Sequence, residues 1–157
     1  MTNETHIWYA MLCTESALDL FEQWIGSTEP RAILNEVKAY LTSQDAIDET
    51  ICDRASEAAL NAHVLANSYR FVSSFRYPLF EPMEAFIKNV ADIAVAVNFI
   101  VRCVVGRISV EKGVRGAMEC VHRVNLQNKI DFYNMAEMAV KQGESKCYVS
   151  ENYTELR

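Results

Sequence analysis

The spacing of apolar residues in this chain is helical from one end to the other. The longest uninterrupted pattern runs from Gln44 to Phe75, where apolar residues recur at steps of three and four, as on one face of a helix. This stripe consists of Ile47, Ile51, Ala55, Ala58, Ala62, Leu65, Tyr69 and Val72. Because many side chains on this face are small, the backbones of neighbouring helices can approach it closely. We therefore expect a long central helix at about 44–75.

Two shorter patterns precede this helix. Residues 5–25 carry apolar residues at helical spacing, and Gly26 is placed to end that helix as a C-terminal cap. The run from Ser27 to Pro30 then combines an N-cap candidate with a proline near the first helical position. It predicts a second helix that ends near Leu41.

The second half of the chain predicts at least two further helices. Residues 82–106 read as a buried core helix, whose apolar run is too short to span a bilayer. Residues 107–116 are ambiguous, because two glycines weaken a continuous helix there. Residues 114–141 predict one long helix or two collinear ones, and Gly143 is expected to end the last of them. The prediction is an all-α bundle of five to six helices in a single domain, residues 1–143, followed by a polar tail at 144–157.

Composition and charge narrow the class of partner. The chain has 157 residues, of which 50% are apolar, and its net charge is −6. Residues 1–57 hold 11 acidic side chains against 3 basic ones, a balance of −8, whereas residues 58–157 hold 10 against 12, a balance of +2. This charge disfavours direct binding of nucleic acid and favours a basic protein partner, including a nucleic-acid-binding one.

The motifs of common catalytic and metal sites are missing from the sequence. Glu119 and His122 form one Glu-x-x-His step, but a di-iron bundle needs two such steps and two further glutamates. We therefore expect that the protein is not an enzyme and that it binds no metal and no cofactor. The five cysteines are odd in number and widely spaced, which argues against a disulfide framework and for a reducing compartment. With no signal peptide and no membrane span in view, the expected location is the cytoplasm.

Three polar residues fall on otherwise apolar helices. His63 follows an alanine-rich segment, and Asn98 and Arg102 lie in the predicted core helix. If buried, Asn98 and Arg102 need hydrogen-bond partners, for which Asp92 and His63 are candidates. These residues predict either a polar network in the core or a small-ligand pocket.

Three segments resemble the small all-helical immunity proteins of bacterial polymorphic-toxin systems. They are residues 13–22 (Cys-Thr-Glu-Ser-Ala-Leu-Asp-Leu-Phe-Glu), residues 30–33 (Pro-Arg-Ala-Ile) with an aromatic residue at Tyr40, and residues 58–63 (Ala-Ala-Leu-Asn-Ala-His). Their order and rough spacing agree with that family over about a third of the chain. The resemblance implies an all-α protein that binds and neutralises a toxin without catalysis of its own.

The leading functional hypothesis is a non-catalytic acidic binding protein. It would inhibit or neutralise a protein partner, as a toxin immunity protein or a phage anti-defence protein does. The predicted contact residues are Asp19, Glu22, Glu29, Arg31, Asp45, Asp48 and Glu49. Two alternatives stay open: a structural protein that forms a homodimer or larger oligomer, and a helical domain that binds a small ligand.

Overall fold

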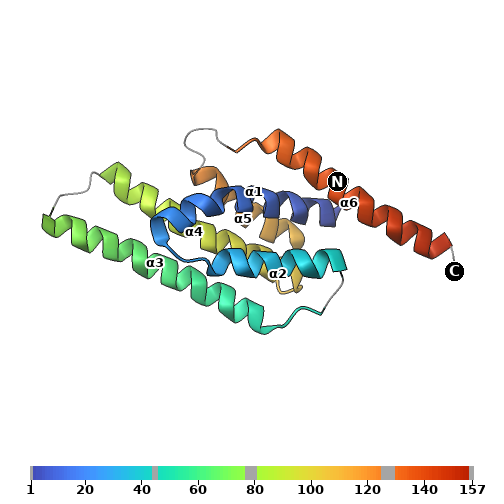
Figure 1. Ribbon diagram of the computed structural model, residues 1–157, viewed down its shortest axis with the longest axis horizontal. Helices are drawn as coiled ribbons and strands as arrows, with labels where there is room; N and C mark the ends of the chain where they lie inside the picture. The colour runs from blue at the N-terminus through green and yellow to red at the C-terminus, as the bar shows by residue number, and fades with distance from the viewer. Residues whose placement is uncertain (1, 44–45, 77–80, 125–129, 156–157) are drawn as a thin grey trace.

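The computed structural model describes residues 2–43, 46–76, 81–124 and 130–155, with side chains throughout these ranges except at 69–76, 81–83 and 144–155. The described residues form six α-helices and no strand, so the all-α prediction is confirmed. Figure 1 shows them packed into a bundle. The helices are α1 Asn3–Ile25, α2 Glu29–Ser43, α3 Thr50–Arg76, α4 Glu81–Val104, α5 Val110–Val124 and α6 Phe132–Glu155.

The connection between α1 and α2 follows the predicted capping chemistry. Gly26 has a φ of +84°, and its backbone N–H donates to the carbonyl oxygen of Glu22 at 3.0 Å. Glycine reaches this left-handed conformation without a steric penalty, so it ends α1 as expected. The hydroxyl oxygen of Ser27 then accepts a hydrogen bond from the N–H of Glu29 at 3.3 Å, at the start of α2.

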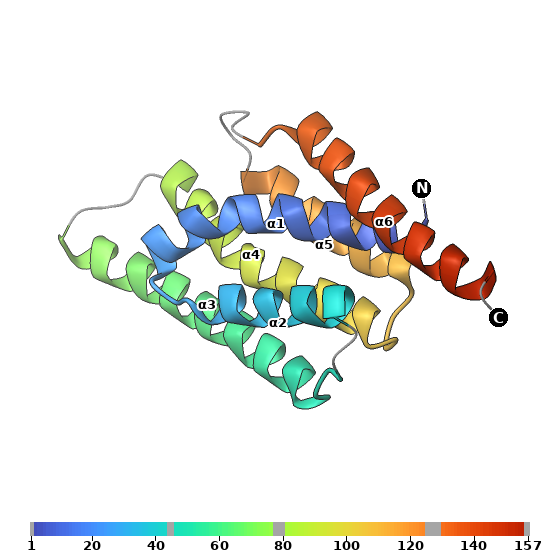
Figure 2. The same ribbon diagram turned by 45° about the vertical axis from the view of Figure 1, so that its right-hand side comes forward.

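The centre of the bundle is α4 and not the helix that the sequence pattern favoured. α4 packs against α1, α2, α3 and α5, whereas α3 lies along one side, with α4 as its main neighbour (Figures 1 and 2). The prediction of a long helix at about 44–75 is confirmed as α3, but its central position is a correction. The described side chains explain it, because α3 buries mainly alanines on one face, whereas α4 buries large side chains on several faces. The largest of these are Val90, Ile93, Val97, Ile100 and Val101, each at most 1% exposed.

Two glycines bring α5 close to α4. A methyl group at Gly113 would lie 2.5 Å from Cβ of Cys103 and 3.0 Å from the carbonyl oxygen of Phe99, and one at Gly116 would lie 2.8 Å from the Phe99 ring. α5 passes through both glycines without a break and begins after Ser109, whose hydroxyl accepts from the N–H of Lys112 at 3.2 Å. The two glycines, expected to weaken the helix, are therefore positions of close packing.

The segment at 114–141 forms two helices, which was one of its two predicted alternatives. They are the end of α5 and the start of α6, and α6 continues past Gly143 to Glu155. The prediction that the helix ends at Gly143 is therefore wrong. Gly143 does not end the helix because its missing side chain has a packing role: a methyl group there would clash with the side chain of Thr5. Figure 2 shows α6 lying beside α1, its main packing partner. The sequence also predicts an aromatic loop at 75–82 from its two prolines, and residues 77–80 of that segment lie outside the described residues.

Candidate functional site

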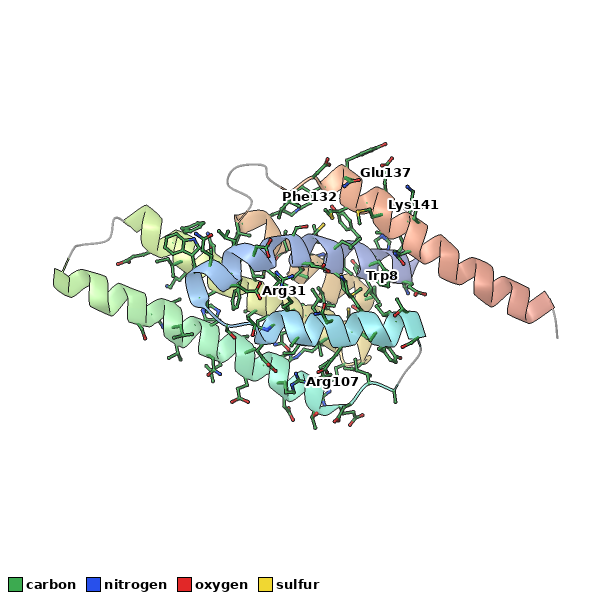
Figure 3. The ribbon with its side chains drawn as sticks, in the orientation of Figure 1. Trp8, Arg31, Arg107, Phe132, Glu137 and Lys141 are labelled. Carbon is green, nitrogen blue, oxygen red and sulfur yellow. The ribbon has the colours of Figure 1, made fainter. Side chains whose placement is uncertain are left out.

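Half of the predicted acidic surface is held in ion pairs within the chain. Arg31 of α2 reaches α1, where its guanidinium lies 2.7 Å from Asp19 and 2.8 Å from Glu22 (Figure 3). Lys38 pairs with Glu15 in the same way, about two turns closer to the end of α2. Arg31 therefore ties α1 to α2, and the charge that Asp19 and Glu22 offer to a partner is reduced.

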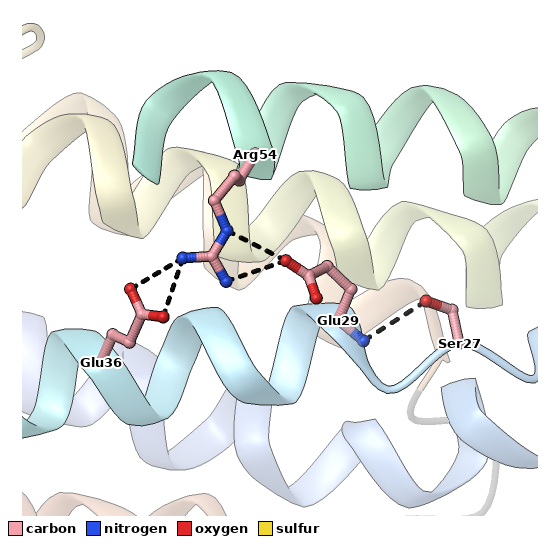
Figure 4. Close-up of polar contacts among 4 residues, drawn as sticks. All are labelled: Ser27, Glu29, Glu36 and Arg54. Atoms are coloured by element: carbon pink, nitrogen blue, oxygen red, sulfur yellow. Dashed lines mark hydrogen bonds and ion pairs between the residues drawn. The ribbon is translucent and has the colours of Figure 1, made fainter. Parts of the chain in front are cut away.

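A second cation binds α3 to α2. The guanidinium of Arg54 donates two hydrogen bonds to Glu29, at 2.9 and 3.1 Å, and two to Glu36, at 2.8 and 2.9 Å (Figure 4). A guanidinium that donates to two carboxylates at once is held in a fixed geometry. The predicted contact residue Glu29 thus has a structural partner 25 residues away in the sequence.

Of the predicted contact residues, the two described carboxylates without an ion pair, Asp48 and Glu49, lie at the start of α3. Asp48 accepts a hydrogen bond from the backbone N–H of Thr50 at 3.0 Å, which lowers the pKa of its carboxyl, so it caps the helix. Glu49, Asp53 and Glu57 are exposed, and within the described part of the chain they form no ion pair. Asp45, another predicted contact residue, lies outside the described residues.

The outer face of α3 continues this acidic stretch with exposed aliphatic side chains. Leu60 is 64% exposed and Val64 is 55% exposed, among the most exposed large apolar residues that the structure describes. Asp53, Glu57, Leu60 and Val64 follow one another at steps of four, three and four, so they share one side of the helix. We call these four residues together with Glu49 the α3 outer face.

The sequence contained the signal for this face. Leu60 and Val64 fall off the alanine stripe, on the side of the helix opposite Ala58, Ala62 and Ala66, which are buried. Leu65, expected within the stripe, is 41% exposed and lies at its edge. The predicted contact residues are all charged and do not include Leu60 or Val64. A partner that buried these two aliphatic side chains would gain the most free energy from desolvation.

The predicted polar network has a different composition. His63 Nε2 lies 3.0 Å from Asp92 Oδ1, and Arg123 of α5 lies 3.3 Å from Asp92 Oδ2, so one carboxylate joins α3, α4 and α5. Asn98 lies six residues beyond Asp92, about a third of a turn away around α4. Its amide oxygen is buried without a hydrogen-bond partner among the described residues, and Arg102 is exposed. Of the three predicted members, only His63 belongs to the network.

The cysteines behave as core residues. Cys13, Cys52, Cys103 and Cys120 are all buried. Burial raises the pKa of the Cys13 thiol to about 12 and that of Cys103 and Cys120 to about 11. A thiol is nucleophilic only as its thiolate, so these three groups are unreactive at neutral pH.

Comparisons with other proteins provide no further guide. No family model and no curated protein match the sequence, and no solved structure matches the fold. Across the described helices, none is both long enough and apolar enough to cross a membrane. The same residues contain no cluster of three His, Cys, Asp or Glu side chains that could hold a metal ion.

Proposed function

We propose that this chain is a non-catalytic protein-binding module that inhibits or neutralises a basic protein, such as a toxin or a nucleic-acid-binding defence protein. The observation that carries the proposal is the exposure of Leu60 and Val64 on the same side of α3 as Asp53 and Glu57, in a row that begins at Glu49. The resemblance to toxin immunity proteins agrees with this function. The buried thiols fit a reducing compartment, and we propose the cytoplasm.

The two aliphatic side chains supply the centre of such an interface. Burying an exposed leucine or valine against a partner is worth about 1.5–3 kcal/mol when burial is complete. Protein interfaces gain most of their affinity from a few such central residues, which a polar rim surrounds. On the α3 outer face, Leu60 and Val64 form the centre, and the carboxylates at one end form part of the rim.

The rim determines the chemistry of the partner. Free carboxylates attract lysine and arginine side chains and repel phosphate groups, so the best fit is a basic protein surface with an apolar centre. A nucleic-acid-binding groove on a toxin or nuclease has such basic residues. The chain would then block the groove by covering it.

The function is tested by capture of partners from extract of the source organism, at low and at moderate salt. Three proteins serve as bait: the natural chain, Leu60→Gln/Val64→Gln, and a control, Tyr133→Gln/Met138→Gln. Tyr133 and Met138 are 76% and 42% exposed on α6, so the control removes apolar surface elsewhere. We expect one basic protein that binds the natural chain and the control, and binds the α3 variant at least tenfold more weakly.

The electrostatic part is tested on the purified partner. Neutralising Glu49, Asp53 and Glu57 to glutamine or asparagine should lower the association rate at low salt and flatten its salt dependence. Neutralising Asp19 and Glu22, which are paired with Arg31, should have a smaller effect. Equal effects of the two sets would contradict the assignment of the surface to α3.

The same proteins separate the oligomer alternative from the binder. If the natural chain sediments as a dimer and Leu60→Gln/Val64→Gln sediments as a monomer, the α3 outer face joins two copies of this chain. In that case no basic partner should depend on these residues. If the natural chain is a monomer at all concentrations, the α3 outer face does not join two copies of this chain, and a different protein is its partner.

A further inference from the structure

The rest of the bundle covers α6 on one side only. Among the described helices, α6 contacts α1 alone. Its inner side includes Ala139, which is fully buried, and Gly143, which packs on Thr5 in the first turn of α1. The turns of α6 after Gly143 extend beyond the start of α1 (Figures 1 and 2). No described helix covers the opposite side of α6, so that side is available to another molecule.

The uncovered side of α6 carries apolar residues along a shallow, open hollow of about 390 Å³. Tyr133 is 76% exposed, and Ala136 and Val140 are half-buried. These three residues follow one another at steps of three and four, so they share one side of the helix. Glu137 and Lys141 line the same hollow and are exposed, and Figure 3 shows both at the upper edge of the molecule. We call these five residues the α6 outer face.

The two charges on the α6 outer face are opposite in sign and are not used within the chain. Glu137 and Lys141 lie four residues apart, yet they form no ion pair with each other or with any other described residue. Glu111 and Arg115 have the same spacing on α5, and they do pair. The α6 outer face therefore offers one negative and one positive charge, about one helical turn apart, to a molecule outside the chain.

We propose that the α6 outer face joins two copies of this chain, with their α6 helices side by side and antiparallel. Every contact in such a symmetric dimer occurs twice. With the two-fold axis level with Ala139, Glu137 of each copy lies beside Lys141 of the other, and two ion pairs form. Parallel helices would instead bring like charges together, which is unfavourable. A second antiparallel copy thus matches the charge pattern, and Tyr133 and Val140 of both copies supply the apolar contact.

This dimer is separate from the proposed binding of a basic protein. α6 and α3 do not touch within the described residues, so the dimer leaves the α3 outer face of both copies uncovered. The variant Tyr133→Gln/Met138→Gln separates the two proposals, because it should dimerise at least tenfold more weakly and still capture the basic protein. Each proposal can therefore fail without the other.

The dimer is tested by sedimentation equilibrium of the full chain over a wide range of concentrations. We expect a reversible equilibrium between monomer and dimer. Glu137→Lys and Lys141→Glu should each weaken the dimer at least tenfold, because either change sets like charges against each other twice. The double variant Glu137→Lys/Lys141→Glu exchanges the two charges and should restore the dimer. An equimolar mixture of the two single variants should form a mixed dimer more strongly than either variant dimerises alone.

The matched controls are Glu111→Lys and Arg115→Glu, which make the same changes of net charge at the same helical spacing on α5. They should dimerise like the natural chain, and circular dichroism checks that every variant keeps its helices. Four results would overturn the proposal: a natural chain that stays a monomer, single variants that dimerise as strongly as the natural chain, a double variant as weak as the single ones, or controls that weaken the dimer equally. Loss of the dimer in Leu60→Gln/Val64→Gln would also overturn it, because the copies would then join through α3.

Discussion

The two long neighbours α3 and α4 use apolar residues in opposite ways. α4 turns its large side chains inward, and Ile93, Val97 and Ile100 are at most 1% exposed. α3 turns alanines inward and leaves Leu60 and Val64 in solvent. A helix that buries mainly small residues contributes less to the core, and its exposed large apolar residues can contact a partner. The comparison separates a helix that stabilises the fold from one that we propose serves recognition.

The strongest way to break this comparison is to truncate one aliphatic residue on each helix. Ile100→Ala should lower the free energy of unfolding by about 2–5 kcal/mol, since it removes a fully buried side chain. Leu60→Ala should lower it by less than about 0.5 kcal/mol, because that side chain already contacts water. Urea unfolding of both variants measures the difference. Similar losses would show that α3 contributes to the core as α4 does.

The close contact between α4 and α5 is tested by whether Gly113→Ala raises or lowers the free energy of unfolding. In an ordinary helix interior, Gly→Ala stabilises by about 1 kcal/mol. At Gly113 the added methyl would meet Cys103 and the Phe99 carbonyl, so we expect Gly113→Ala to destabilise by about 1–3 kcal/mol. Cys103→Ala in the same chain should recover little of the loss, because alanine keeps the Cβ atom that lies nearest to the added methyl group. Stabilisation by Gly113→Ala alone would show that the two helices are not in close contact there.

The buried thiols make stability fall at high pH. Burial raises the pKa of the Cys120 thiol to about 11. Between about pH 8.5 and 11 the unfolded chain therefore releases a proton that the folded chain retains, which costs up to about 1.4 kcal/mol per pH unit for each such thiol. Its contribution is complete below about pH 8.5 and is lost as the pH rises toward 11.

This pH effect is measured by urea unfolding across that range. Cys120→Ala should show a shallower fall of stability with pH than the natural chain. Val121→Ala removes a neighbouring buried side chain without a thiol, and should lose stability while keeping the natural slope. Parallel slopes in all three proteins would contradict the assigned shift.

The ion pairs should have the smallest effects. Arg54→Gln removes four hydrogen bonds that link α3 to α2, and we expect a loss of about 1 kcal/mol, limited by the partial exposure of the group. The control is Arg115→Gln, which breaks an exposed pair with Glu111 within α5 and should cost less than about 0.5 kcal/mol. Equal values from thermal unfolding would show that Arg54 does not fix α3 against α2.

The sequence predicted what depends on local spacing and missed what depends on neighbours. Periodicity identified the helices, because it reflects one face of each, and Gly26 was identified because its cap is local. The central position of α4 could not be predicted from the sequence, because it depends on which other helices pack around it. Gly113 and Gly143 read as helix breakers, because the close contacts that require glycine involve distant residues.

The candidate site shows the same limit. The acidic residues were visible in the sequence, but their ion pairs were not, since Arg54 lies 25 residues from Glu29. His63 was identified as polar on an apolar helix, but its partner Asp92 was predicted for Asn98 and Arg102 instead. Leu60 and Val64 could have been found from their position off the alanine stripe.

The most direct measurement places stability and binding side by side for Leu60→Gln/Val64→Gln. Glutamine has a helix propensity similar to that of leucine, so the helix itself should be retained. We predict a melting temperature within about 2 °C of the natural chain, together with an affinity for the captured basic partner at least tenfold lower. A fall of more than about 5 °C would place these side chains in the core, and an unchanged affinity would show that the α3 outer face does not bind the partner.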